Sequence, residues 1–204
     1  MTLDDLTEGA RARALWVSGA FHDGADTVIL LSPAPDFWPR FTSDPEYGDG
    51  IPDPMDRWSA RVIGNWAADL IAAPLFPFGE DAAPFLSLAK ASGRAHSSPV
   101  HLLAHDAAGL MISYRGGLRI GGRIDLPASP PAPCTTCAAP CRTACPIGAL
   151  TADGYDVPAC RAYLRSDAGK TCLETGCAVR TTCPPAQTHG RLAAQSAFHM
   201  RAFR

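Results

Sequence analysis

The sequence lacks several features that would assign it to a broad class of protein. No stretch is long and apolar enough to form a transmembrane helix, and the N-terminal residues lack the basic segment and apolar run of a signal peptide. The formal net charge is −2, so the chain also lacks the excess of basic residues typical of proteins that bind nucleic acids or membrane surfaces. We therefore expect a cytoplasmic protein without a nucleic-acid or membrane partner.

Cysteine is absent from most of the chain, because all eight cysteines lie at or after position 134. In the reducing cytoplasm, this number of cysteines is more consistent with metal binding than with a disulfide framework. They form two runs, each of which ends in Cys-Pro. The first run is Cys134-x2-Cys137-x3-Cys141-x3-Cys145-Pro146, and the second consists of Cys160, Cys172, Cys177 and Cys183-Pro184.

The first run resembles the iron–sulfur motif of bacterial ferredoxins, C-x2-C-x2-C-x3-C-P, with one additional residue before Cys141. In a ferredoxin with two clusters, the fourth cysteine of the run binds the other cluster. This crossed pattern predicts two sets of ligands, although the wide spacing of the second run leaves open which of its cysteines binds which cluster. The predicted sets are Cys134, Cys137, Cys141 and Cys183 for one [4Fe-4S] cluster, and Cys145, Cys160, Cys172 and Cys177 for the other.

Zinc is the main alternative, because four-cysteine zinc sites also use short C-x2-C pairs. A zinc site gives no reason for two runs that both end in Cys-Pro, so iron–sulfur binding is the favoured interpretation. The segment from Cys134 onward also contains more Arg and Lys than Asp and Glu, which would partly offset the negative charge of thiolate-bound clusters.

The first 126 residues have the pattern of an α+β domain with helices and a mixed or antiparallel sheet. Apolar residues at helical spacing predict a helix over 2–14. The segments 15–21 and 27–31 read as strands joined by a hairpin turn. The Pro-, Asp- and Gly-rich stretch 32–54 predicts a long surface loop, whose aromatic side chains we expect to fill the core.

Further elements are predicted before the cysteines. A helix is expected to begin at Pro54 with Asp53 as its N-cap, and a second helix covers 85–91. Strands are expected over 100–104, 110–114 and 118–124.

The Pro-rich segment 127–133 predicts a stiff linker and a domain boundary. We therefore expect an α+β domain over 1–126 and a small dicluster ferredoxin domain over 134–204 that ends in a C-terminal helix. Within the second domain, Asp156 is predicted to cap a short helix that carries Cys160. The remaining cysteines of the second run, Cys172, Cys177 and Cys183, are predicted to lie on loops.

The cysteine region resembles the ferredoxin-type domain of epoxyqueuosine reductases and their short relatives. The resemblance rests on motifs in the context of each ligand, and it covers roughly the last 80 residues. Ile124-Asp-Leu-Pro127 is similar to the strand end that precedes the cysteines in that family. The matching motifs are Cys145-Pro-Ile-Gly-Ala149, Cys160-Arg-Ala-Tyr163-Leu164, Gly176-Cys177 and Cys183-Pro184.

The resemblance implies an N-terminal α+β domain of reduced nitroreductase-like type, which in the family binds cobalamin. The family's general acid is an Asp in an Asp-x-Ala-Pro context, and Asp81-Ala-Ala-Pro84 has that form. The structural alternative for Asp81 is a helix N-cap. The chain lacks the Trp-Asn that follows the family's last Cys-Pro and the C-terminal helical repeats, so it looks like a short ferredoxin-like relative.

Three hypotheses for the function follow. The first is an electron-transfer protein with two [4Fe-4S] clusters and a redox partner protein. The second is an oxidoreductase that uses the clusters to reduce a cofactor, cobalamin or flavin, in the N-terminal domain. The third is a zinc-binding interaction module. Two weaker sets of candidate binding residues are His96, His101 and His105 for a pocket, and Arg115, Arg119 and Arg123 for an anion, each with a solvent-exposed strand face as the alternative.

Overall fold

The computed structural model describes all 204 residues, which divide into two compact units. We call Met1–Arg94 together with Ser113–Pro130 the sheet unit, and Ala95–Ile112 together with Pro131–Arg204 the cysteine unit. Helices and antiparallel strands make up both units, which confirms the predicted α+β class. None of the helices has the length and apolar character needed to span a bilayer.

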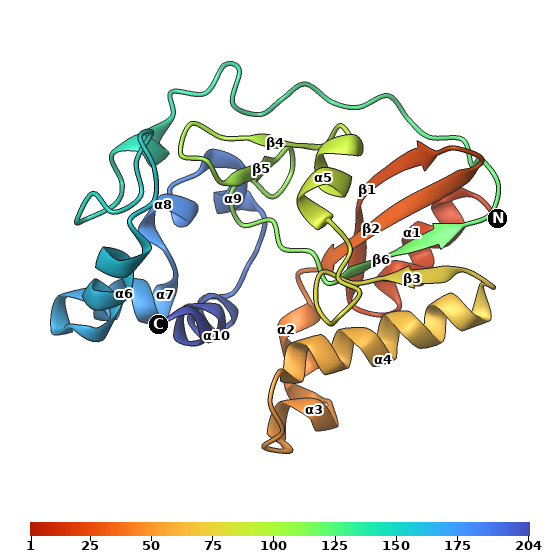
Figure 1. The fold of residues 1–204 in the computed structure, drawn as a ribbon, viewed down its shortest axis with the longest axis horizontal. Helices are drawn as coiled ribbons and strands as arrows, with labels where there is room; N and C mark the ends of the chain where they lie inside the picture. The colour runs from red at the N-terminus through yellow and green to blue at the C-terminus, as the bar shows by residue number, and fades with distance from the viewer. The chain divides into compact units, whose positions relative to one another are not determined.

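The sheet unit contains a four-stranded sheet with helices on both faces (Figure 1). Its elements are α1 (Leu3–Arg11), β1 (Leu15–Asp23), β2 (Asp26–Pro33), α2 (Phe37–Ser43), α3 (Pro45–Gly48), α4 (Pro54–Asp69), β3 (Ala73–Leu75), α5 (Phe85–Ala91) and β6 (Gly116–Ile120). The strand order is β1-β2-β6-β3, and every pair is antiparallel. The predicted first helix and the β1–β2 hairpin are therefore confirmed.

The central strand β2 is buried from 27 to 33, because both faces of the sheet are covered. Its apolar run is continuous and does not alternate with polar residues, as expected for a strand covered on both faces. A Cβ atom at Gly116 would contact Ile63 of α4, whereas one at Gly19 would contact Ser92 at the end of α5. These two helices therefore lie on opposite faces of the sheet.

The stretch 32–54 is not the long loop that its composition predicts, because it contains α2 and α3. Phe37 and Phe41 are fully buried, with their rings stacked at 5.6 Å, and Phe37 meets Trp58 of α4 edge-on at 5.1 Å. The expectation that these aromatic side chains fill the core is confirmed. The area that they bury outweighs the weak helix propensity of the surrounding sequence.

Other local predictions need correction. Helix α4 begins at Pro54 as predicted, but Asp53 adopts a left-handed conformation with φ 54° and makes no capping hydrogen bond through its side chain. Residues 110–114 form no strand, and the strand expected over 118–124 is β6, which covers Gly116–Ile120. A bend at Gly121 and Gly122 ends β6 at Ile120.

The cysteine unit has a two-stranded sheet and short helices around the cysteines. Its elements are β4 (Ala95–Ser97), β5 (Leu103–His105), the 3-10 turn η1 (Pro140–Arg142), α6 (Val157–Arg165), the 3-10 turn η2 (Asp167–Gly169), α7 (Lys170–Thr175), α8 (Ala178–Thr181), α9 (Pro184–Thr188) and α10 (Ala193–Phe203). The predicted C-terminal helix is two helices, separated near Gly190 at φ 77°. The second of these, α10, packs against α7 (Figure 1).

The segment Ala95–Ile112 belongs to the cysteine unit, although the predicted domain over 1–126 includes it. Its side chains Val100, Ala104 and Leu110 share a buried apolar cluster with Cys141 and Cys183. Arg180 and Arg191 fix the same segment by donating hydrogen bonds to the carbonyl oxygens of residues 110 and 111, at 2.6 and 3.0 Å. A boundary placed by linker composition alone could not reveal this packing, because its contacts are distant in the sequence.

Candidate metal centre

Three cysteines that are close in the sequence and a fourth that is distant from them line one cavity of the cysteine unit. We call Cys134, Cys137, Cys141 and Cys183 the first set. Cys141 lies within η1, and Cys183 lies directly before α9. Prolines and the side chain of Leu110 form much of the remaining wall. The cavity therefore presents sulfur ligands in an apolar setting.

A tight turn brings the first three of these thiols together. The backbone N–H of Cys137 donates to the carbonyl of Cys134 at 3.4 Å, and the N–H of Ala139 donates to Sγ of Cys137 at 3.4 Å. Ala139 has φ 53°, and Pro140 then starts η1. This reversal of the chain explains how the additional residue before Cys141 is accommodated.

The loop after β5 packs against the fourth thiol of the first set, that of Cys183. His105 and Gly109 exchange two backbone hydrogen bonds, of 3.0 and 2.8 Å, which close the loop. A Cβ atom at Gly109 would lie 2.6 Å from Sγ of Cys183 and 2.8 Å from the backbone nitrogen of Ala186. Only glycine fits here, and its φ of 52° adds a second reason. The loop thereby fixes the position of Cys183.

Burial and mutual repulsion disfavour thiolates in the first set. Burial raises the pKa of Cys134, and the negative charges of Cys137, Cys183 and Cys141 raise it further. Burial likewise raises the pKa of Cys141, with Cys183 as the next cause. Because metals bind thiolates, a bound cation is what would stabilise the deprotonated form here.

The other four thiols form a second set: Cys145, Cys160, Cys172 and Cys177. Cys160 is on α6, Cys172 is on α7 and not on a loop as predicted, and Cys177 directly precedes α8. Burial raises the pKa of Cys172, and a hydrogen bond from the backbone N–H of Ala178 opposes this rise. The negative charges of Cys177, Cys145 and Cys160 raise the pKa of Cys172 further. The thiols that influence Cys172 therefore all belong to the same set.

Local hydrogen bonds hold Cys160 in the second set. The side chain of Asp156 accepts a hydrogen bond from the N–H of Ala159 at 2.9 Å, so it caps α6 as predicted. The hydroxyl of Tyr155 donates to Sγ of Cys160 at 3.4 Å. Burial raises the pKa of Tyr155, and the hydrogen bond to Cys160 raises it further, so the phenol stays protonated as a donor. Burial also raises the pKa of Cys160, and this hydrogen bond opposes the rise.

Cys134, Cys137, Cys141 and Cys183 line one cavity, and the charges of Cys177, Cys145 and Cys160 act on Cys172. Which cluster each cysteine binds stays a prediction from the crossed ferredoxin pattern. All eight cysteines are free thiols, without disulfide bonds. No group of three or more His, Cys, Asp or Glu side chains is arranged to hold a metal ion. Four thiolates are the donor set of a [4Fe-4S] cluster and also of a four-cysteine zinc site, so the donor chemistry of each set fits either group.

The weaker histidine candidates do not converge on a pocket. His105 is fully buried, and its Nδ1 accepts the backbone N–H of Ala107 at 3.0 Å. His101 contacts the carbonyl of Ala152 through Nε2 at 2.6 Å. His96 pairs with Ala104 in the two-stranded sheet, one position from His105, so the two histidines lie on opposite faces.

The predicted arginine and aspartate candidates lie in the sheet unit. Arg115 pairs with Asp56 at 3.0 Å, Arg119 pairs with Asp23 at 2.7 Å, and Arg123 contacts His22 at 2.7 Å. The carboxylates neutralise Arg115 and Arg119, and Arg123 is held by His22 and the carbonyl of Gly24, so the three arginines do not form an open anion site. Asp81 is exposed in the turn before α5, and the N-cap position of that helix is Pro84, so Asp81 is not its cap.

No family model matches the chain, and no curated protein or solved structure is significantly similar to it. The resemblance to epoxyqueuosine reductases therefore remains a prediction based on the cysteine motifs.

Sequence reasoning missed Gly109, where a Cβ atom would meet Sγ of Cys183, and Tyr155, whose hydroxyl donates to Sγ of Cys160. Gly109 lies in a turn whose long-range contact has no local signal. Tyr155 could have been noticed, since it lies five residues before Cys160, next to the helix cap.

Proposed function

We propose that this protein transfers electrons by means of two [4Fe-4S] clusters, one bound by each set of cysteines. The observation that carries the proposal is that Cys134, Cys137, Cys141 and Cys183 line one cavity, and it is supported by the charges of Cys145, Cys160 and Cys177, which raise the pKa of Cys172. A cluster of this type takes four cysteine ligands, and it accepts and releases one electron at a time. The role of this chain is to hold the clusters and to adjust their potentials.

Three features of the cysteine unit support iron–sulfur chemistry. The first set lies in an apolar cavity, which restricts the access of solvent to a bound cluster. Backbone N–H groups donate toward sulfurs in both sets, at Cys137 and at Cys172. Such hydrogen bonds stabilise the negative charge of thiolate ligands. The motif resemblance to short relatives of epoxyqueuosine reductases points to the same chemistry.

The proposal assigns no catalytic step to the sheet unit. A reductase of this family type would need a cobalamin or flavin beside Asp81, and Asp81 is an exposed turn residue. Binding of either cofactor to the purified protein would support the reductase hypothesis, and it can be measured by absorption spectroscopy. A redox partner protein is part of the proposal in both cases.

Analysis of iron and acid-labile sulfide in anaerobically purified protein tests the proposal. Two cubane clusters require about eight irons and about eight sulfides per chain. The protein should be brown, and reduction should produce the electron paramagnetic resonance signal of a reduced [4Fe-4S] cluster. A colourless protein with stoichiometric zinc and no sulfide would contradict the proposal and support the interaction module.

The substitution Cys145→Ser tests the crossed assignment. Cys145 follows Cys141 closely in the sequence, yet it belongs to the second set with Cys160, Cys172 and Cys177. The variant should therefore damage the second cluster and leave the one bound by Cys137 and Cys141 intact. Measurement of the iron content together with the electron paramagnetic resonance spectrum would show which of the two clusters is lost. Loss of the cluster at Cys137 and Cys141 would refute the crossed arrangement.

A further inference from the structure

Tyr155 contacts a thiol of the second set from outside the cysteine runs. Its hydroxyl donates a hydrogen bond to Sγ of Cys160 at 3.4 Å. The backbone on either side is fixed, because Tyr155 bridges to Leu150 and the N–H of Asp156 donates to the carbonyl of Ala149 at 2.7 Å. The tyrosine is therefore held at the start of α6, where its hydroxyl reaches one turn into the helix.

The last residues of α10 support the tyrosine ring. The ring of Phe203 stacks on that of Tyr155, with the centroids 6.1 Å apart and an angle of 11° between the planes. Arg161 in turn holds Phe203, since its guanidinium carbon lies 5.1 Å from the ring centroid and its Nε donates to the carbonyl of Phe203 at 3.0 Å.

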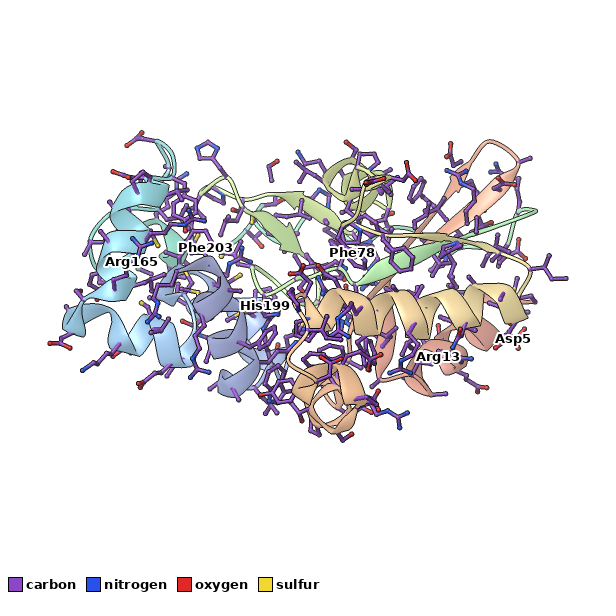
Figure 2. The ribbon with its side chains drawn as sticks, turned by 60° about the horizontal axis from the view of Figure 1, so that its bottom comes forward. Asp5, Arg13, Phe78, Arg165, His199 and Phe203 are labelled. Carbon is purple, nitrogen blue, oxygen red and sulfur yellow. The ribbon has the colours of Figure 1, made fainter.

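The same end of α10 is attached to α6 at a further point. Arg165 donates to the carbonyl of Arg204 at 2.8 Å, and Figure 2 shows Arg165 and Phe203 close together in the cysteine unit. Arg161 and Arg165 are one turn apart on α6, so both arginines contact the last two residues of the chain, Phe203 and Arg204. This arrangement orients the phenol toward the sulfur.

We propose that Tyr155 raises the reduction potential of the cluster bound by the second set, by donating its hydroxyl hydrogen bond to Cys160. This inference rests on the proposed function. An added electron increases the negative charge on the cluster and its thiolates, and a hydrogen-bond donor stabilises that charge. Removal of the donor therefore makes reduction less favourable. Tyr155 is a positioning residue, because it acts through the sulfur of Cys160.

The inference also predicts the order of the two potentials. The first set includes Cys141 and Cys183, which are 6% and 8% exposed, whereas no thiol of the second set is buried. Tyr155 itself is 38% exposed, so solvent reaches the edge of the second set. Solvent exposure and the hydroxyl donor both favour the more negative, reduced state. The cluster of the second set should consequently be reduced first.

An anaerobic redox titration of Tyr155→Phe tests the inference. Dithionite supplies one electron to each cluster, and electron paramagnetic resonance follows the two steps. The step of the second set is identified with the Cys183→Ser protein, which should retain only that cluster. Tyr155→Phe keeps the ring against Phe203, so its iron content should stay at the wild-type value. The potential of the step assigned to the second set should shift to more negative values, while the potential of the step assigned to the first set stays in place.

Tyr163→Phe is the matched control, because it removes from α6, the helix that carries Cys160, a tyrosine hydroxyl that makes no hydrogen bond to sulfur. Neither potential should move in that protein. Phe203→Leu is a second test, since it retains the hydroxyl but removes the stacked ring, and it should shift the same potential by a smaller amount.

Three outcomes would overturn the inference. With both clusters present, an unchanged potential in Tyr155→Phe, or an equal shift in Tyr163→Phe, would refute the role of the hydroxyl and leave the proposed function intact. Wild-type protein without iron and sulfide would refute both the role of the hydroxyl and the proposed function.

Discussion

The two cysteine sets bring four thiols together by different local structures. In the first set, three thiols follow one another through a tight turn, and two of the four are buried in the apolar cluster that includes Val100 and Leu110. In the second set, the helices α6 and α7 carry two of the thiols, and none of the four is buried. The first set is thus part of a core, whereas the second lies between short helices near the surface.

This difference separates two ways of fixing a ligand. Close spacing fixes the first set through backbone conformation, and packing of Ala95–Ile112 supplies the remaining constraint. Wide spacing leaves the second set dependent on helix caps and on side-chain contacts such as that of Tyr155. We therefore expect substitutions in the first set to affect folding and metal content together, and those in the second set to affect metal content more than folding.

The largest predicted effect distinguishes Cys183→Ser from Cys160→Ser. Each variant should lose one cluster, so iron should fall from about eight to about four per chain. Cys183→Ser should also lower the free energy of unfolding by about 1–3 kcal/mol more than Cys160→Ser, because it replaces a sulfur packed in the buried apolar cluster by a polar hydroxyl. At position 160 the serine is only partly buried and can accept the hydrogen bond from Tyr155.

Anaerobic denaturant titration, with iron analysis of the same samples, measures this difference. Equal stabilities for Cys183→Ser and Cys160→Ser would contradict the assignment of the first set to the core. Loss of all iron from either variant would indicate that the two sites do not assemble independently.

The sequence predicted those features that depend on local signals. The helix over Phe85–Ala91, the hairpin of β1 and β2, and the cap of α6 by Asp156 all have such signals, and all three were correct. The grouping of the cysteines rests on local spacing and a known ligation pattern, and it stays a prediction.

The predictions that failed involved contacts distant in the sequence. Residues 32–54 have a loop-like composition, but burial of Phe37 and Phe41 stabilises helix α2 there. Residues 110–114 are apolar like a strand, yet hydrogen bonds from Arg180 and Arg191 satisfy two of their carbonyls in an irregular conformation. Neither arginine carries a sequence signal that would identify its partner.

An intermediate effect is expected for Gly109→Ala, which tests how closely the loop after β5 controls the first set. The left-handed φ of 52° costs an alanine about 1–2 kcal/mol, and the new Cβ would lie 2.6 Å from Sγ of Cys183. The sulfur must move, so occupancy of the first cluster should decrease. Iron analysis and the resonance spectrum measure this loss.

Gly148→Ala is the matched control for this substitution. Gly148 has a comparable φ of 64°, but a Cβ atom there would meet nothing within 4 Å. In the control, backbone strain should lower the free energy of unfolding by the same amount, about 1–2 kcal/mol, while the first cluster stays fully occupied. If both variants retain full occupancy, the contact between Gly109 and Cys183 does not position the ligand.

The smallest predicted effect concerns the second set and the cap of α6. Asp156→Ala removes the acceptor of the N–H of Ala159, which should cost about 1 kcal/mol of stability. A melting temperature lower by about 2–4 °C is expected for a chain of this size. Because α6 carries Cys160 and directly follows Tyr155, the second cluster should also be lost more rapidly in air. Circular dichroism and the decay of visible absorption measure the two effects.

Two controls separate the cap from the charge of Asp156. Asp156→Asn retains a side-chain oxygen that can accept the hydrogen bond, so it should behave like the wild-type protein. Asp153→Ala removes the same charge from the preceding loop, where no helix begins. It should leave the melting temperature and the decay rate unchanged. If Asp153→Ala destabilises the second cluster as much as Asp156→Ala does, charge near the site controls its stability, and the difference between the two sets does not depend on the helix cap.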